Sequence, residues 1–133
     1  MVSAFLAACG GSVEEGHTPD TTAPVFIKGD PEGTVRHVCA ITAAFDDPIE
    51  ASSVTPQSFI IKSDSAAEPL AASTGTWEIS PSSDTIALFT PSSGVSLIGT
   101  YTVTVTTGIT NTAGLNLAAD HSWTFTASMP CPP

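Results

Sequence analysis

Three acidic side chains stand close together in the sequence and form the densest group that could bind a metal ion. Asp46 and Asp47 precede a proline, and Glu50 follows shortly after. Ca²⁺ takes about six to eight oxygen ligands, so Asp30 or Glu32 would have to join them. Alternatively, these carboxylates keep a turn solvated and the surface resistant to aggregation. We expect no metal and keep the three only as calcium candidates.

Motifs that combine a nucleophile or a metal with a base are missing from the chain. Its histidines, His17, His37 and His121, are far apart, and none belongs to a His-Glu-x-x-His pair. The chain has no Gly-x-Ser-x-Gly elbow, phosphate-binding loop or Cys-x-x-Cys pair. His121 begins a predicted strand, where a histidine is commonly half exposed. We therefore predict that the protein is not an enzyme and needs no cofactor.

The first of three cysteines, Cys9, closes the apolar run VSAFLAAC, which is followed by Gly-Gly-Ser. This stretch resembles the lipobox of bacterial lipoproteins, in which the cysteine receives a diacylglycerol and becomes the new N-terminus. Only eight residues precede Cys9 and none is basic, whereas a signal peptide begins with a basic segment. We expect either that the true start lies upstream or that the chain is a fragment. Alternatively, the string is a coincidence in an alanine-rich terminus.

The other two cysteines, Cys39 and Cys131, remain as a pair if Cys9 carries lipid. An exported chain is in an oxidising compartment, where two such thiols can form a disulfide. Alternatively, Cys39 is a buried free thiol that packs as a small apolar residue. The Met-Pro-Cys-Pro-Pro stretch around Cys131 would then be an exit into a further domain.

Charge excludes two classes of partner. The chain has 133 residues with a net charge of -10, because 13 acidic side chains face only three basic ones, Lys28, Arg36 and Lys62. Nucleic-acid binding depends on basic groups that neutralise phosphates, so we expect no nucleic-acid partner. Direct binding to an anionic membrane surface is disfavoured for the same reason. A lipid on Cys9 is the membrane attachment that we expect.

Composition divides the chain into four segments. Residues 1–9 are a lipoprotein-type signal remnant, and residues 10–22, rich in Gly, Glu, Pro and Thr, are a flexible tether. Residues 23–127 form one domain, which is long enough to bury a core. Residues 128–133 are a proline-rich tail or a linker to a missing domain.

Short apolar or alternating runs follow one another through the domain, and no stretch keeps a helical period. They predict an all-β, Ig-like sandwich of about seven antiparallel strands with Greek-key connections. The runs are 25–28, 35–45, 58–62, 75–80, 85–90, 100–107 and 122–127. A short helical turn is predicted after 45, with Asp47 as N-cap and Pro48 as its first residue.

Alternation also predicts which side chains are buried, because successive residues of a strand point to opposite faces. In the strand over 100–107 the buried face is Tyr101, Val103 and Val105, and the threonines between them face water. Two further buried sets are predicted, one in the last strand and one in the second: His121, Trp123 and Phe125; Cys39, Ile41, Ala43 and Phe45.

Four stretches in this order resemble the bacterial Ig-like domain of the SbsA type: DTTAPV from Asp20, ITAAFDDPIEASSVTPQSFII from Ile41, FTPSSGVSLIGTYTVTVTTGITNTAGLNLAAD from Phe89 and HSWTFT from His121. The chain departs from the family at 111–115, where NTAGL replaces a commoner acidic loop. The resemblance implies a sandwich that serves as a spacer, stalk or interaction module in surface-layer proteins, adhesins, lipoproteins and secreted enzymes.

We therefore predict a non-catalytic structural spacer of a lipid-anchored protein at the bacterial cell surface, on the outer membrane, or secreted. The alternative is an adhesion module that binds carbohydrate or protein beside another secreted domain, such as an ice-binding or polysaccharide-acting one. That alternative requires exposed aromatic side chains, and nearly all aromatic residues fall on predicted buried faces.

Overall fold

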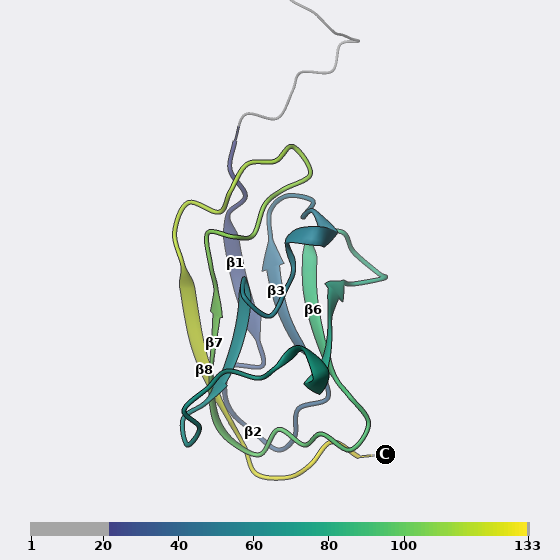
Figure 1. Ribbon diagram of the computed structural model, residues 1–133, viewed down its shortest axis with the longest axis vertical. Coiled ribbons are helices and arrows are strands. Elements are labelled where there is room, and N and C mark those ends of the chain that lie inside the picture. Colours follow the sequence, from purple (N-terminus) through teal and green to yellow (C-terminus); the bar gives the residue numbers. More distant parts are fainter. Residues whose placement is uncertain (1–21, 133) are drawn as a thin grey trace, which may run out of the picture.

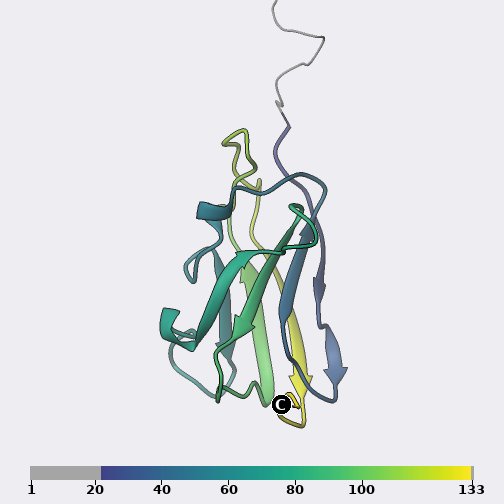
Figure 2. The ribbon, with the colours of Figure 1, turned by 90° about the vertical axis from the view of Figure 1, so that its right-hand side faces the viewer.

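Two four-stranded sheets pack face to face in the computed structural model, which describes residues 22–132 (Figures 1 and 2). The strand order is β1-β3-β6-β5 in the first sheet and β2-β8-β7-β4 in the second. Apart from the edge strand β2, this is the grouping of an immunoglobulin sandwich, so the predicted fold class is confirmed. The strands are β1 Phe26–Asp30, β2 Gly33–Val35, β3 Ile41–Phe45, β4 Phe59–Ser63, β5 Gly75–Ile79, β6 Ile86–Pro91, β7 Gly99–Val105 and β8 His121–Ala127.

The predicted second strand is wrong over its first half. The run 35–45 is divided: β2 ends at Val35, residues 36–40 form a loop, and β3 begins at Ile41. β2 also pairs in parallel with β8, so the second sheet is mixed instead of antiparallel throughout. The physical reason is a change of sheet, because the chain leaves the first sheet after β1, lines the edge of the second and returns for β3.

Cys39 consequently does not belong to the buried face that was predicted for it. Ile41, Ala43 and Phe45 are buried as expected, but Cys39 is exposed in the loop before β3. The helical turn is also displaced. The 3-10 helix η1 spans Ala51–Ser53 with Glu50 as its N-cap, instead of beginning at Pro48. A second 3-10 helix, η2, spans Ala72–Thr74 and was not predicted.

The core lies between the two sheets, and strand alternation predicted its β7 and β8 layers correctly. Tyr101, Val103 and Val105 are buried, while the threonines between them are half buried on the outer face. Trp123 and Phe125 are buried and His121 is half buried. Inward residues of both sheets and several loop residues complete the core: Val38, Ile41, Ala43, Phe45, Ile49, Val54, Phe59, Ile61, Ala87, Phe89, Leu97, Ile109, Leu117 and Ala127.

Two tryptophans tie the sheets together across this core. The indole N–H of Trp77 on β5 donates a 2.7 Å hydrogen bond to the Phe59 carbonyl oxygen on β4, which belongs to the opposite sheet. Trp123 on β8 donates to the Pro31 carbonyl oxygen at 3.0 Å. A side chain at Gly29 of β1 would overlap the Trp123 ring. β1 therefore packs its backbone directly on this indole.

The described chain begins and ends at opposite ends of the sandwich (Figure 1). We call the end that holds Thr22 the N-terminal pole and the end that holds Pro132 the C-terminal pole. Within residues 22–132, no helix is long and apolar enough to cross a membrane.

Candidate functional site

A buried asparagine organises the N-terminal pole. Asn111, in the loop between β7 and β8, is only 1% exposed. Its Oδ1 accepts hydrogen bonds from the backbone N–H groups of Ala113, at 3.1 Å, and Leu115, at 2.8 Å. Its Nδ2 donates to Asp47 Oδ2 at 2.9 Å and to the Thr22 carbonyl oxygen at 3.2 Å. One side chain thus links the point where the chain enters the domain to two loops.

Replacing Asn111 by alanine should lower the free energy of unfolding by about 2–3 kcal/mol, because it removes the hydrogen bonds of a buried side chain and takes their acceptor from the part-buried N–H groups of Ala113 and Leu115. Urea unfolding followed by tryptophan fluorescence measures this loss. Asn116→Ala is the matched control, since Asn116 is exposed and its Nδ2 makes a single 2.7 Å bond to the Thr107 carbonyl oxygen. Equal losses in the two variants would contradict the organising role of Asn111.

The calcium candidates have separate partners at the same pole. Asp46 Oδ1 accepts the backbone N–H of Val25 at 2.8 Å, and Asp47 accepts from Asn111. Glu50 is exposed at the start of η1. Among the described residues, no three His, Cys, Asp or Glu side chains are grouped so that they could hold a metal ion. The structure does not bring these three carboxylates together.

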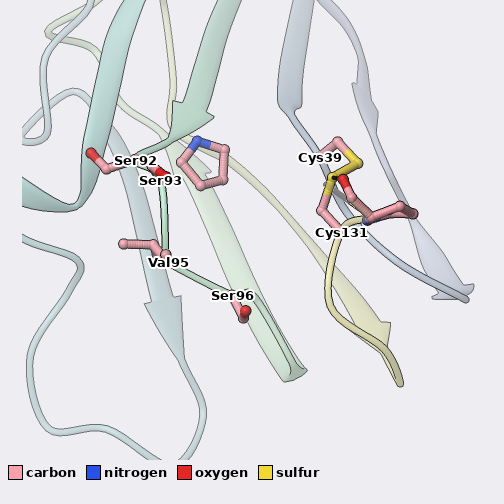
Figure 3. A pocket seen from close by; sticks show the side chains of 9 residues that line it. Cys39, Ser92, Ser93, Val95, Ser96 and Cys131 are labelled. Atoms are coloured by element: carbon pink, nitrogen blue, oxygen red, sulfur yellow. Dashed lines mark hydrogen bonds between the residues drawn. A yellow bond between two sulfur atoms is a disulfide. The ribbon is translucent and has the colours of Figure 1, made fainter.

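At the C-terminal pole, Cys39 and Cys131 are joined by a disulfide, with Cα atoms 5.1 Å apart and a sequence separation of 92 (Figure 3). The backbone segments that precede the two cysteines are also paired: the N–H of Met129 donates to the Arg36 carbonyl oxygen at 2.9 Å. Figure 3 shows the loop of Ser92 to Ser96 across a cleft from the disulfide.

This cleft has a volume of about 330 Å³. Apart from the two cysteines, its lining is made of the loop and two prolines: Pro91, Ser92, Ser93, Gly94, Val95, Ser96 and Pro132. None of these side chains ionises, so the cleft offers neither an acid nor a base. The third cysteine, Cys9, which is the lipid-attachment candidate, lies outside the described residues, as does His17.

The outer face of β7 and β8 is a ladder of hydroxyl groups. Thr100 pairs with Thr126, and Thr104 with Ser122, each with 2.8 Å between the two side-chain oxygens. Thr102 Oγ1 donates to Asp64 Oδ1 at 3.2 Å. Cross-strand pairs of this kind stabilise a sheet by about 0.2–1 kcal/mol each. The hydroxyl groups bond mainly to one another, so stabilisation of the sheet explains why this face is rich in threonine.

Three further side chains of the described chain could do acid-base chemistry: His37, His121 and Tyr101. His37 is exposed, and His121 stacks on Phe26 with ring centroids 5.0 Å apart. Burial raises the pKa of Tyr101 above its ordinary value, and its ring stacks on Phe125 at 5.4 Å. Tyr101 therefore stays protonated at neutral pH and acts as a core residue.

Solved structures with the same fold include two of one surface-layer protein. The S-layer protein rSbsC(31-844) matches with a TM-score of 0.56 and 22% identity, over 84% of this chain but 14% of that one. SbsC domains 1-6 match with a TM-score of 0.57 and 22% identity, over 85% of this chain and 15% of that one. This chain thus spans about one-seventh of their length.

A smaller protein has the same fold. CopC from Methylosinus trichosporium OB3b matches with a TM-score of 0.55 and 13% identity, over 79% of this chain and 93% of that one. At these identities the likeness shows the fold alone. No curated protein sequence is significantly similar to this chain.

The family model of the bacterial Ig-like domain matches residues 20–127. This range includes all eight strands, the Asn111 loop at the N-terminal pole and the hydroxyl ladder. The sandwich topology and this match together show that the chain belongs to the bacterial Ig-like domain family.

Proposed function

We propose that this domain is a non-catalytic spacer of an exported, lipid-anchored protein at the bacterial cell surface. The observation that carries the proposal is the placement of the chain ends at opposite poles of the sandwich (Figure 1). A domain inserted in this way holds its N-terminal and C-terminal neighbours apart by its full long axis. Such in-line placement suits a spacer.

Three further features support the proposal. Bacterial Ig-like domains, the family to which the chain belongs, and the surface-layer domains that it resembles are typical of proteins outside the cytoplasm. A disulfide between Cys39 and Cys131 fits an oxidising compartment. The run before Cys9 resembles a lipobox, and an acyl chain there would hold the protein to a bilayer while the domain stays in water.

Lipid attachment can be tested by expression in a bacterial host, with the upstream genomic segment included. We expect the mature chain to begin at an acylated Cys9 and to sediment with membranes, as measured by intact mass and fractionation. Cys9→Ala should release it. A double variant, Cys39→Ala with Cys131→Ala, keeps the lipid site and is the matched control for the loss of cysteine. A soluble chain that retains Met1 would contradict lipid attachment at Cys9.

A binding module is the alternative, and the exposed hydroxyl ladder is the observation that favours it. Hydroxyl groups can form hydrogen bonds to sugars. The described Phe, Trp and Tyr side chains, however, are all buried or half buried, so none of them offers a fully open ring on which a sugar could stack. Titration of the purified chain with surface polysaccharides distinguishes the two functions. Saturable binding that Thr102→Val and Thr124→Val weaken would favour the binding module over the spacer.

A further inference from the structure

The segment from Thr22 to Cys39 runs along the sandwich from the N-terminal pole to the C-terminal pole (Figures 1 and 2). It consists of β1 and β2 with the non-strand residues before, between and after them. We call this segment the strap. Strands are nearly extended, with a rise of about 3.3 Å per residue. The strand residues of the strap therefore add little length when the strap is pulled straight.

The strap ends at the disulfide, and the disulfide partner Cys131 lies next to the point where the chain leaves the domain. The shortest covalent path between the two poles is therefore the strap, the sulfur-sulfur bond and Cys131. The remaining strands, β3 to β8, lie in the closed loop between the two cysteines. A pull on the two ends of the chain cannot lengthen a loop that it does not pass through.

We infer that the Cys39–Cys131 disulfide makes this domain a tension-bearing link of limited extension, in which the strap carries the covalent load and the chain of β3 to β8 cannot be drawn out. This load-bearing function rests on the proposed spacer role, because tension arises only when the domain connects an anchor to something beyond its C-terminal pole. It adds a mechanical task for the cysteine pair, separate from its effect on folding stability.

The hydrogen bonds of the strap are arranged to resist such a load. β1 pairs with β3 along Phe26–Asp30, and β2 pairs with β8 along Gly33–Val35. A pull between the poles acts along these strands, so the bonds of each ladder are loaded together instead of one after another. Trp123 adds a lateral contact, because its ring stacks on Phe26 at 5.4 Å and its N–H bonds to Pro31.

Single-molecule stretching of the full chain between two handle domains tests the inference. All samples carry Cys9→Ser, which removes the third thiol and prevents disulfide exchange. The oxidised protein should unfold with a length gain below about 60 Å, because Cys39 comes only 17 positions after Thr22 in the chain. Cys39→Ser with Cys131→Ser should gain about 300–330 Å more, because 92 further residues become extensible.

The oxidised arm is informative even if the cysteine-free variant does not fold. In that case the oxidised chain is held at constant force and a reductant is added, and the hidden length should then appear in one step. A full-length gain in a sample that intact mass shows to be oxidised would overturn the inference. So would free thiols at Cys39 and Cys131 in the exported protein.

The outcome is separable from that of the proposed function. Stretching uses purified protein and does not depend on where the chain resides in the cell, whereas fractionation of the Cys9→Ala variant does. A short extension together with a protein that is not exported would leave the mechanical link standing and remove the cell-surface spacer. A long extension in an anchored protein would remove the mechanical link and leave the cell-surface spacer standing.

Discussion

Replacing Cys131 by serine should lower the free energy of unfolding by about 4 kcal/mol. The bond to Cys39 spans 92 residues, and closing a loop of this size restricts the unfolded chain by about 4–5 kcal/mol in the chain-entropy description. Urea unfolding in a Cys9→Ser background measures the change as a lower midpoint. The effect arises mostly in the unfolded state, so the folded sandwich should keep its far-ultraviolet circular dichroism.

Two controls separate this effect from other causes. The reduced protein with both cysteines present should lose as much stability as Cys131→Ser, because each state lacks the same covalent link. Cys9→Ser alone should be neutral, since Cys9 precedes the domain. A loss under about 1 kcal/mol in Cys131→Ser would mean that the bond does not restrict the unfolded chain as a single long loop does.

Placing an alanine at Gly29 should destabilise the domain by about 3 kcal/mol, the upper part of the usual range for an overpacked core. The added carbon would overlap the six-membered part of the Trp123 indole, which is buried and held by its bond to Pro31. Either β1 moves away from the core or the indole leaves its position. Unfolding in urea measures the loss, and a red-shifted tryptophan emission would report the displaced ring.

The matched control for Gly29→Ala is Gly94→Ala. Gly94 has a φ of +87°, and an added Cβ there would meet only open space, so its substitution tests backbone strain without a clash and should cost about 1 kcal/mol. Combining Gly29→Ala with Trp123→Phe should recover part of the loss, because the smaller ring vacates the overlap. Strictly additive losses in that double variant would contradict the steric explanation.

Much of the fold could be predicted from local patterns. Alternation of Val and Tyr with Thr in β7, and of Trp and Phe with Ser and Thr in β8, predicted the buried faces correctly, because a strand side chain can point only to one face or the other. The turn residues between the runs predicted most strand boundaries to within one or two residues. Neither result required knowledge of which strands are neighbours.

The cysteine pair and the N-terminal pole depended on contacts that no local pattern specifies. In the sequence, Val35 to Phe45 resembles one strand, because apolar residues continue through it. The break at residues 36–40 arises because this chain segment changes sheets, and that change exposes Cys39 beside Cys131. In the sequence, Asn111 stands out only because its loop departs from the family pattern, whereas its partners Thr22 and Asp47 are 89 and 64 residues away.

An all-β sandwich, its threonine-rich outer face and a strongly acidic composition could be predicted from the sequence alone, since each depends on residue type or on a period of two residues. The sheet switch at β2, the buried hydrogen bonds of Asn111 and the path of the strap from one pole to the other are seen only in the folded molecule. Those features depend on contacts between residues far apart in the sequence, which no local pattern specifies.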